Sequence, residues 1–241
     1  MLETSISIAT RIQGSITVYK GMDKGRADRL FDDAGNVHDI TSLNSDPPSD
    51  FINTMTGLGI YFTVCQELAV KYACYIKHRD NVIAVVVVRA TIPNSAIESL
   101  SSAQLQKIFW PSYKWKSLIY HSRRGLKLPS DLGRSLRDAI LIIGTISTRP
   151  KRVYDRMDGP EEVTEDHLLR DKNGNPAIQY VFRGESGGEF FMQHIMRSMT
   201  VHAMTTREYI SWYQNRSAYP IHNESLPEAP FANMGESANR P

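Results

Sequence analysis

Runs of apolar residues along the chain predict where its strands lie. SITVYKG (residues 15–21) alternates apolar and polar positions, whereas NVIAVVVVRATIP (81–93) and DAILIIGTIS (138–147) are apolar almost throughout. Alternation is typical of a strand with one buried face, and a continuous Val/Ile run indicates a strand buried on both faces. The segments GIYFT (59–63) and AIQYVFRG (177–184) are rich in β-branched and aromatic residues and are also predicted to be strands.

Between the predicted strands, apolar residues recur at helical spacing. CQELAVKYACYIKH (65–78) predicts an amphipathic helix that packs on the sheet. The segment 97–124 is predicted to be helical in two pieces broken at Pro111, because proline lacks a backbone donor and clashes with the preceding turn. The segment 185–204 predicts a helix that begins near Gly188.

The chain is predicted to form one α+β domain over residues 15–215. Its 241 residues, of which 41% are hydrophobic and 22% charged, are typical of a globular protein. The segment 32–50 is rich in Asp, Asn, Ser and Pro and is predicted to be a mobile loop within the domain. Residues 217–241 show no apolar periodicity and are predicted to be a disordered tail.

Charge, cysteine content and the length of the apolar runs limit the expected partners and cellular location of the protein. The 28 basic residues are nearly balanced by 26 acidic ones, so the net charge of +2 does not indicate a nucleic-acid partner. Cys65 and Cys74 fit neither a paired metal motif nor a disulfide framework, which favours a reducing compartment. The run 82–88 is too short to span a bilayer, and the first residues lack a signal-peptide pattern. We therefore expect a cytoplasmic protein without a membrane partner.

The histidines are scattered along the chain. None of the seven has acidic or cysteine partners at the spacing of metal ligands. No metal site is expected.

Three strand segments, in this order, resemble the motifs of the ADP-ribosyltransferase superfamily. YKG (19–21) ends the first strand where the superfamily has aromatic-His-Gly or aromatic-Arg-Gly. GLGIYFT (57–63) with ELAVKYA (67–73) resembles the tyrosine motif of the poly(ADP-ribose) polymerase catalytic domain. QYVF (179–182) stands where the third motif carries a catalytic Glu, and is similar to a bacterial and fungal branch of ADP-ribosyltransferase-like domains. The resemblance covers about residues 15–196 and implies a split, strongly twisted mixed sheet with packed helices.

The resemblance implies that NAD binds between the first and second of these strands. The main chain of Gly21 would bond the nicotinamide carboxamide, because glycine permits a close approach of ligand to backbone. Tyr61 would stack on the nicotinamide ring and Tyr72 would line the opposite wall. Lys20 would hold a ribose or a phosphate as a point charge. The same motifs add Tyr19, Gly59 and Thr63 to the implied NAD-binding set.

The catalytic position of the third motif carries an amide. Cleavage of the nicotinamide–ribose bond passes through an oxocarbenium-like species that an anionic group stabilises. The matching residue is Gln179, which can hydrogen-bond ribose hydroxyls but has no charge. Glu185 or Glu189 in RGESGGE could supply the carboxylate if that segment folded back into the cleft. Near a helix N-terminus both acids would equally suit the helix dipole.

The basic run YKWKSLIYHSRRGLK (113–127) has two interpretations. Cations interleaved with aromatic residues are typical of a surface for nucleic acid or nucleotide phosphates. With Trp110 just before it, the run also fits an amphipathic helix that turns Trp110, Trp115 and Leu118 inward and its lysines outward, and we favour this packing. Arg123 and Arg124 are retained as candidates for phosphate contacts.

Two functions compete on the implied fold. The first is an NAD-dependent ADP-ribosyltransferase or NAD glycohydrolase, which passes ADP-ribose to a macromolecular acceptor or to water. The second is a catalytically inactive module that binds a nucleotide or a protein partner, which Lys20 and Gln179 at two key positions favour. A third alternative is an unrelated α/β protein that matches these short motifs by chance, and it predicts no NAD binding.

Overall fold

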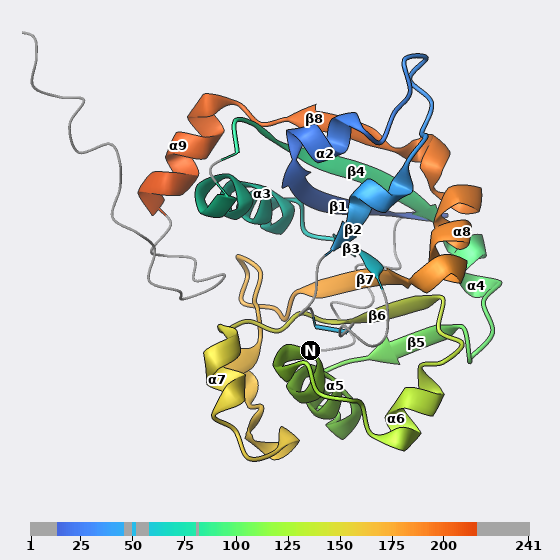
Figure 1. Cartoon of the computed structure of the whole chain (residues 1–241), viewed down its shortest axis with the longest axis vertical. Helices are drawn as coiled ribbons and strands as arrows, with labels where there is room; N and C mark the ends of the chain where they lie inside the picture. Colours follow the sequence, from blue (N-terminus) through green and yellow to red (C-terminus); the bar gives the residue numbers. More distant parts are fainter. Residues whose placement is uncertain (1–13, 46–49, 52–57, 81, 216–241) are drawn as a thin grey trace, which may run out of the picture.

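A mixed eight-stranded sheet forms the centre of the molecule (Figure 1). The computed structural model describes residues 14–45, 50–51, 58–80 and 82–215. The strand order is β5-β6-β7-β3-β1-β4-β8, with β2 paired to β3, and of the described pairs only β5 and β6 run parallel. The strands are β1 Ser15–Asp23, β2 Asn44–Ser45, β3 Gly59–Thr63, β4 Val85–Pro93, β5 Leu105–Ile108, β6 Leu141–Thr145, β7 Ile178–Arg183 and β8 Thr200–Ala203.

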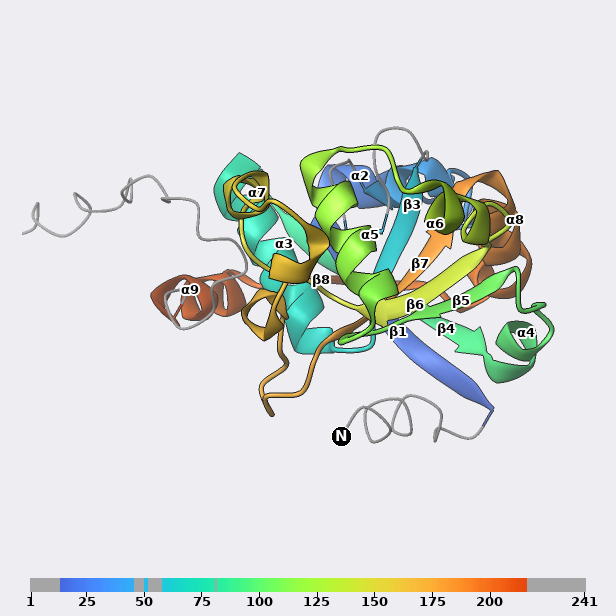
Figure 2. The same ribbon diagram turned by 90° about the horizontal axis from the view of Figure 1, so that it is seen from below.

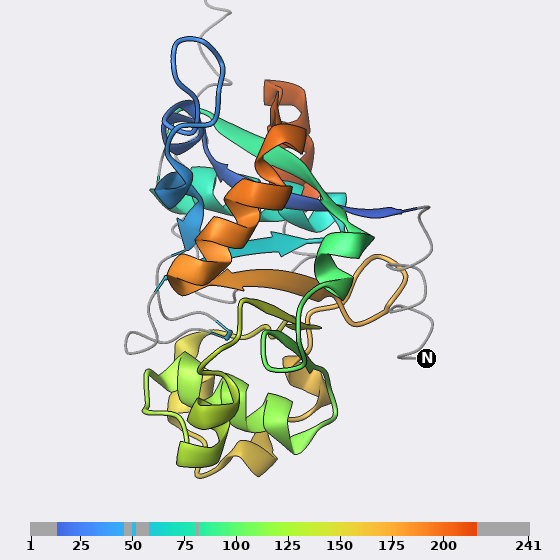
Figure 3. The same cartoon turned by 90° about the vertical axis from the view of Figure 1, so that its right-hand side faces the viewer.

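Helices cover both faces of this sheet (Figures 2 and 3). They are α2 Lys24–Asp28, α3 Gln66–Asp80, α4 Asn94–Glu98, α5 Tyr113–Arg124, α6 Ser130–Ser135, α7 Lys151–Asp155, α8 Gly184–His194 and α9 Thr206–Asn215. Short 3-10 helices are η1 Ile40–Leu43, η2 Pro160–Glu162, η3 Glu165–His167 and η4 Met196–Ser198. α3 packs on β1 and β4, α5 shares a core with β5, β6 and β7 on the same side, and α8 packs on the other side.

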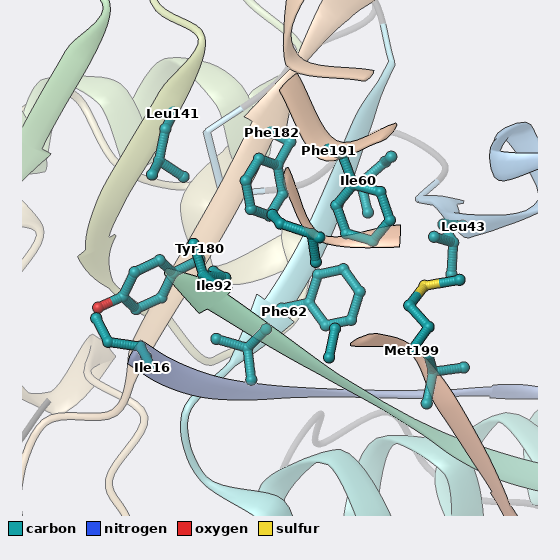
Figure 4. Packing of buried hydrophobic residues seen from close by; sticks show 14 of the residues in the cluster. Ile16, Leu43, Ile60, Phe62, Ile92, Leu141, Tyr180, Phe182, Phe191 and Met199 are labelled. Atoms are coloured by element: carbon teal, nitrogen blue, oxygen red, sulfur yellow. The ribbon is translucent and has the colours of Figure 1, made fainter. Parts of the chain in front are cut away.

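The larger apolar core lies on the α8 side of the sheet (Figure 4). Phe62 of β3 stacks on Phe191 of α8 with ring centroids 5.6 Å apart, and Phe182 of β7 meets Phe62 edge-on. Each buried phenylalanine contributes roughly 1.5–3 kcal/mol through burial. Val88 of β4 and Leu141 of β6 belong to the same cluster. This core therefore runs without interruption behind the central strands.

The sheet is joined narrowly at one place. β1 pairs with β4 along its full length, and β3 pairs with β7 along its full length. Between β1 and β3, in contrast, the single registered pair is Tyr19 with Thr63. The two halves of the sheet are thus tied to each other mainly by the core behind them.

Most predicted elements are present, with shifted bounds. The predicted strands correspond to β1, β3, β4, β6 and β7, and the predicted helix 65–78 corresponds to α3. The α+β class with a mixed sheet and packed helices is confirmed. Within the described part of the chain, no helix combines the length and apolar character needed to cross a membrane.

The prediction of two helices over 97–124 is wrong in its first half. Helix α4 ends at Glu98, and strand β5 follows where the first helix was expected. Leu105 packs against the core on the α8 side, whereas Ile108 is buried in the core beneath α5. So short a segment shows too few apolar residues for this strand alternation to be read from sequence.

The prediction of one helix over 185–204 is also wrong in part. Helix α8 begins at Gly184 and ends at His194. The hydroxyl of Ser198 then donates to the carbonyl oxygen of Thr91 and accepts its N–H, which ties the chain to β4. The following residues pair with β4 as strand β8. Side-chain hydrogen bonds to backbone, of the kind that Ser198 makes, compete with helix continuation.

The predicted loop 32–50 contains regular structure in its described part. Asp32 accepts the N–H groups of Ala34 and Asn36 and closes a turn. The helix η1 and strand β2 follow, and β2 pairs with β3. Residues 46–49 and the predicted tail 217–241 lie outside the described residues, so the mobility of the loop and the disorder of the tail stay predictions.

Candidate functional site

Residues from all three sequence motifs lie side by side across the sheet. Tyr19 of β1 is registered with Thr63 of β3, and Thr63 is registered with Gln179 of β7. Residues directly opposite each other on antiparallel strands point to the same face of the sheet. Here it is the face that α3 and α5 cover, so the three motifs meet in one row.

A pocket of about 280 Å³ lies on this row and is walled by α3 and α5. Seven of the predicted site residues line it, namely Tyr19, Lys20, Gly21, Tyr61, Thr63, Tyr72 and Gln179. Tyr75, Arg26, Asp50 and Arg123 line it as well. The four tyrosines in the lining could stack on an aromatic ring of a ligand. The lining also holds three cationic side chains and one carboxylate, so it favours a ligand with negative charge.

Four predicted residues lie elsewhere. Gly59 pairs with Arg183 at the far end of β3 from Thr63. The segment RGESGGE forms the start of α8, so Glu185 and Glu189 line a different pocket, of about 810 Å³, beside that helix. Arg124 does not line the first pocket; it donates to the carbonyl oxygen of Met157 at 2.9 Å.

The glycine of the first motif is explained by helix packing. A Cβ on Gly21 would lie 2.0 Å from the carbonyl oxygen of Ala69 and 2.5 Å from the amide nitrogen of Ala73. Both atoms belong to the backbone of α3, which cannot yield as a flexible side chain can. Gly21 therefore lets α3 lie directly on β1 and sets the position of the pocket wall that carries Tyr72.

The two cations on the β1 side donate to oxygen atoms of η1, β2 and β3. Lys20 Nζ donates to the hydroxyl of Ser45 at 3.0 Å and to the carbonyl oxygen of Tyr61 at 3.5 Å. Arg26, which the sequence analysis missed, donates to the carbonyl oxygens of Ser42 and Asn44. These contacts hold both cationic groups in the lining of the pocket.

Tyr61 is anchored through its hydroxyl. The N–H of Phe51 donates to the Tyr61 hydroxyl at 3.3 Å, while the half-buried ring lines the pocket. Thr63 is engaged more fully, because Oγ1 donates to the carbonyl oxygen of Ile178 at 3.0 Å and accepts the N–H of Cys65 at 3.2 Å. Tyr61 thus offers a ring face, whereas Thr63 mainly shapes the end of the strand.

The main feature that sequence reasoning missed is Asp50. It is 4% exposed, and its Oδ1 lies 2.6 Å from Nη2 of Arg123 and 2.6 Å from the donating hydroxyl of Ser147. Its Oδ2 accepts the N–H of Ser147 at 2.7 Å and the Nε2 amide of Gln179 at 3.1 Å. A buried carboxylate therefore does reach the third-motif position, but it comes from the chain before β3.

Burial and the Asp50–Arg123 ion pair together shift the pKa values of the surrounding groups. Burial acts to lower the pKa of Arg123, but the Asp50 carboxylate, Tyr154 and Tyr72 together outweigh it, so the pKa is raised. Burial, with the charge of Asp50, raises the pKa of Tyr72. Burial also raises the pKa of Tyr154 to about 12, against the opposing effect of Arg123. Tyr72 and Tyr154 are therefore neutral phenols at physiological pH, and Arg123 is a cation.

The sequence held one partial signal for this cluster. Arg123 was a candidate for a phosphate contact, and the structure places it in the pocket wall, although it is paired with Asp50. Asp50 itself follows a Pro- and Ser-rich stretch whose composition indicates a loop, and no spacing rule links it to residue 123 or 179.

No family model matches the chain, and neither the curated proteins nor the solved structures include one with significant similarity to it.

Proposed function

We propose that the pocket binds NAD and that the protein cleaves its nicotinamide–ribose bond, as an ADP-ribosyltransferase or an NAD glycohydrolase on an ADP-ribosyltransferase-like fold. ADP-ribose would pass to a macromolecular acceptor or to water. One observation carries the proposal: residues from three motifs far apart in sequence, including Tyr19, Tyr61 and Gln179, line a single pocket at the narrow junction between β1 and β3.

The chemistry of the lining suggests a place for each part of NAD. Tyr61 and Tyr72 offer ring faces to the nicotinamide, worth about 0.5–1.5 kcal/mol per aromatic pair beyond burial. Lys20 and Arg26 supply positive charge for the diphosphate, and Gln179 meets the ribose. At about 280 Å³ the pocket is close to the lower limit of typical ligand sites, roughly 300 Å³, so it would take the nicotinamide–ribose half.

A second candidate is a module that binds NAD without cleaving it, and the state of Asp50 favours this. Among the described lining residues Asp50 supplies the one carboxylate, and each of its oxygens has two donors. A carboxylate has about four acceptor positions, so none is left for a ribose hydroxyl, and Arg123 already balances the charge that would stabilise an oxocarbenium-like ribose. Turnover would then require Asp50 to exchange a partner when the ligand enters.

Release of nicotinamide from NAD decides between these functions. The wild type, Tyr61→Ala and Gln179→Ala are incubated with NAD, with Tyr113→Ala as the matched control, because Tyr113 is 63% exposed and lies outside the pocket lining. Release that persists in the control and is lost in both pocket variants supports the enzyme. Calorimetric binding of NAD without release supports the module, and the absence of both release and binding refutes the two functions together.

A further inference from the structure

The amide of Gln179 has one defined orientation. Its Nε2 donates to the Asp50 carboxylate, which can only accept, so the amide nitrogen must face Asp50. Within the described residues nothing donates to the amide oxygen Oε1. Gln179 is 5% exposed and lines the pocket, so Oε1 is the polar atom that it offers to a ligand.

Asp50 is itself immobilised. Arg123 and Ser147 supply three of its four contacts, and both come from the α5 and β6 side of the pocket. Arg123 is tied down in turn, because its Nε donates to the Ser147 hydroxyl at 3.1 Å and its Nη2 to the Ser147 carbonyl oxygen at 3.2 Å. The carboxylate is therefore a fixed acceptor, and the amide of Gln179 adapts to it.

We propose that Asp50 is a positioning residue that holds the Gln179 amide with its oxygen toward the ligand, so that this point of the pocket selects a hydroxyl group and rejects an acceptor. This inference deepens the NAD function proposed above and rests on it for the identity of the ligand. The hydroxyl would be one of those on the nicotinamide ribose.

The same contact explains why an amide suits position 179. A glutamate there would place a carboxylate about 3 Å from that of Asp50, and two carboxylates at that distance resist joint ionisation, so one pKa rises strongly. Among the described residues, the groups that interact electrostatically with Asp50 are Arg123 from α5, Tyr154 from α7 and Tyr72 from α3. The pKa values of all three are raised, so none of them titrates between pH 5 and pH 8.

The contact is tested first without any ligand. In Gln179→Glu the folded state holds a proton that the unfolded chain releases above pH ~4.3, so the unfolding constant rises by up to about tenfold per pH unit until the folded-state pKa is passed. The Tm difference from wild type should therefore widen from pH 5 to pH 8. In the double variant Asp50→Asn/Gln179→Glu, acid and amide are exchanged, and the pH dependence should disappear even if Tm is lower throughout. A Tm difference independent of pH in Gln179→Glu would overturn the proposal.

The ligand selectivity is tested by calorimetry with NAD and with its analogue that lacks the 2′-hydroxyl of the nicotinamide ribose. Wild type should bind the analogue about tenfold more weakly, because one hydrogen bond is lost. Asp50→Asn, whose amide can turn Gln179 around, should lose most of that preference. Equal preference in both proteins would overturn the positioning role. If wild type binds neither compound, the NAD function fails, and the pH experiment still judges the Asp50–Gln179 contact separately.

Discussion

Removing the charge of Arg123 tests how far the buried carboxylate depends on it. The side chains of Arg123 and Asp50 are 12% and 4% exposed and lie 2.6 Å apart, so neither charge has much access to water. Breaking a buried ion pair by removing one partner costs about 3–5 kcal/mol, because the other charge stays buried without compensation. Ser147 and Gln179 continue to donate to Asp50 in Arg123→Met, so we expect the lower end of this range, about 3 kcal/mol.

Urea unfolding measures this loss directly. At a slope of about 2 kcal/mol per molar urea, a loss of about 3 kcal/mol lowers the midpoint by about 1.5 M. The matched control is Lys151→Met, because Lys151 and its partner Asp155 are 49% and 42% exposed and such a pair is worth about 0–1 kcal/mol. If Arg123→Met shifts the midpoint no further than this control does, Asp50 does not need its cation and the reasoning about the buried pair is refuted.

Two further substitutions probe the pocket wall and the response to acid. Gly21→Ala should destabilise the fold by about 1–3 kcal/mol and weaken the proposed NAD binding, because the new Cβ would meet the α3 backbone. Gly133→Ala, whose new Cβ would have nothing within 4 Å, is the control, and equal urea midpoints would contradict the clash. Burial lowers the pKa of His167, so the unfolded chain takes up a proton more readily and wild type loses stability as pH falls below ~6.5. His167→Gln should lose less Tm between pH 7 and pH 5, and parallel Tm curves would contradict this.

The strands of the pocket could be predicted because each carries its own local pattern. The YKG, GIYFT and QYVF segments read as strands from their apolar and β-branched content, and their order suggested that they come together. The antiparallel register then places Tyr19, Thr63 and Gln179 opposite one another. The pairing of β5 with β6 could not be predicted from the sequence, because LQKI has too few residues to show the two-residue alternation of a strand.

The chemistry around Gln179 could not be predicted, because it depends on contacts between distant segments. Asp50 and Ser147 are separated by 97 residues, and Asp50 and Gln179 by 129. In sequence Asp50 is a polar residue in a proline-rich stretch, and its burial results from the core that Phe51 enters next to it. For Glu185 the sequence left two alternatives, a segment folded back into the cleft or an acid near a helix N-terminus, and the second is confirmed because Glu185 lies in the first turn of α8.

The position of the pocket follows from an asymmetry between the two faces of the sheet. On the α8 face one apolar core spans β4, β1, β3, β7 and β6, and holds both halves of the sheet together. On the opposite face the covering layer is divided: α3 lies on β1 and β4, whereas α5 lies over β5, β6 and β7. The gap between these helices stands over the single pair of Tyr19 with Thr63, and polar groups such as Asp50 and Arg123 face into it. A ligand could therefore bind there, or move the two helices slightly, without exposing the core that stabilises the fold.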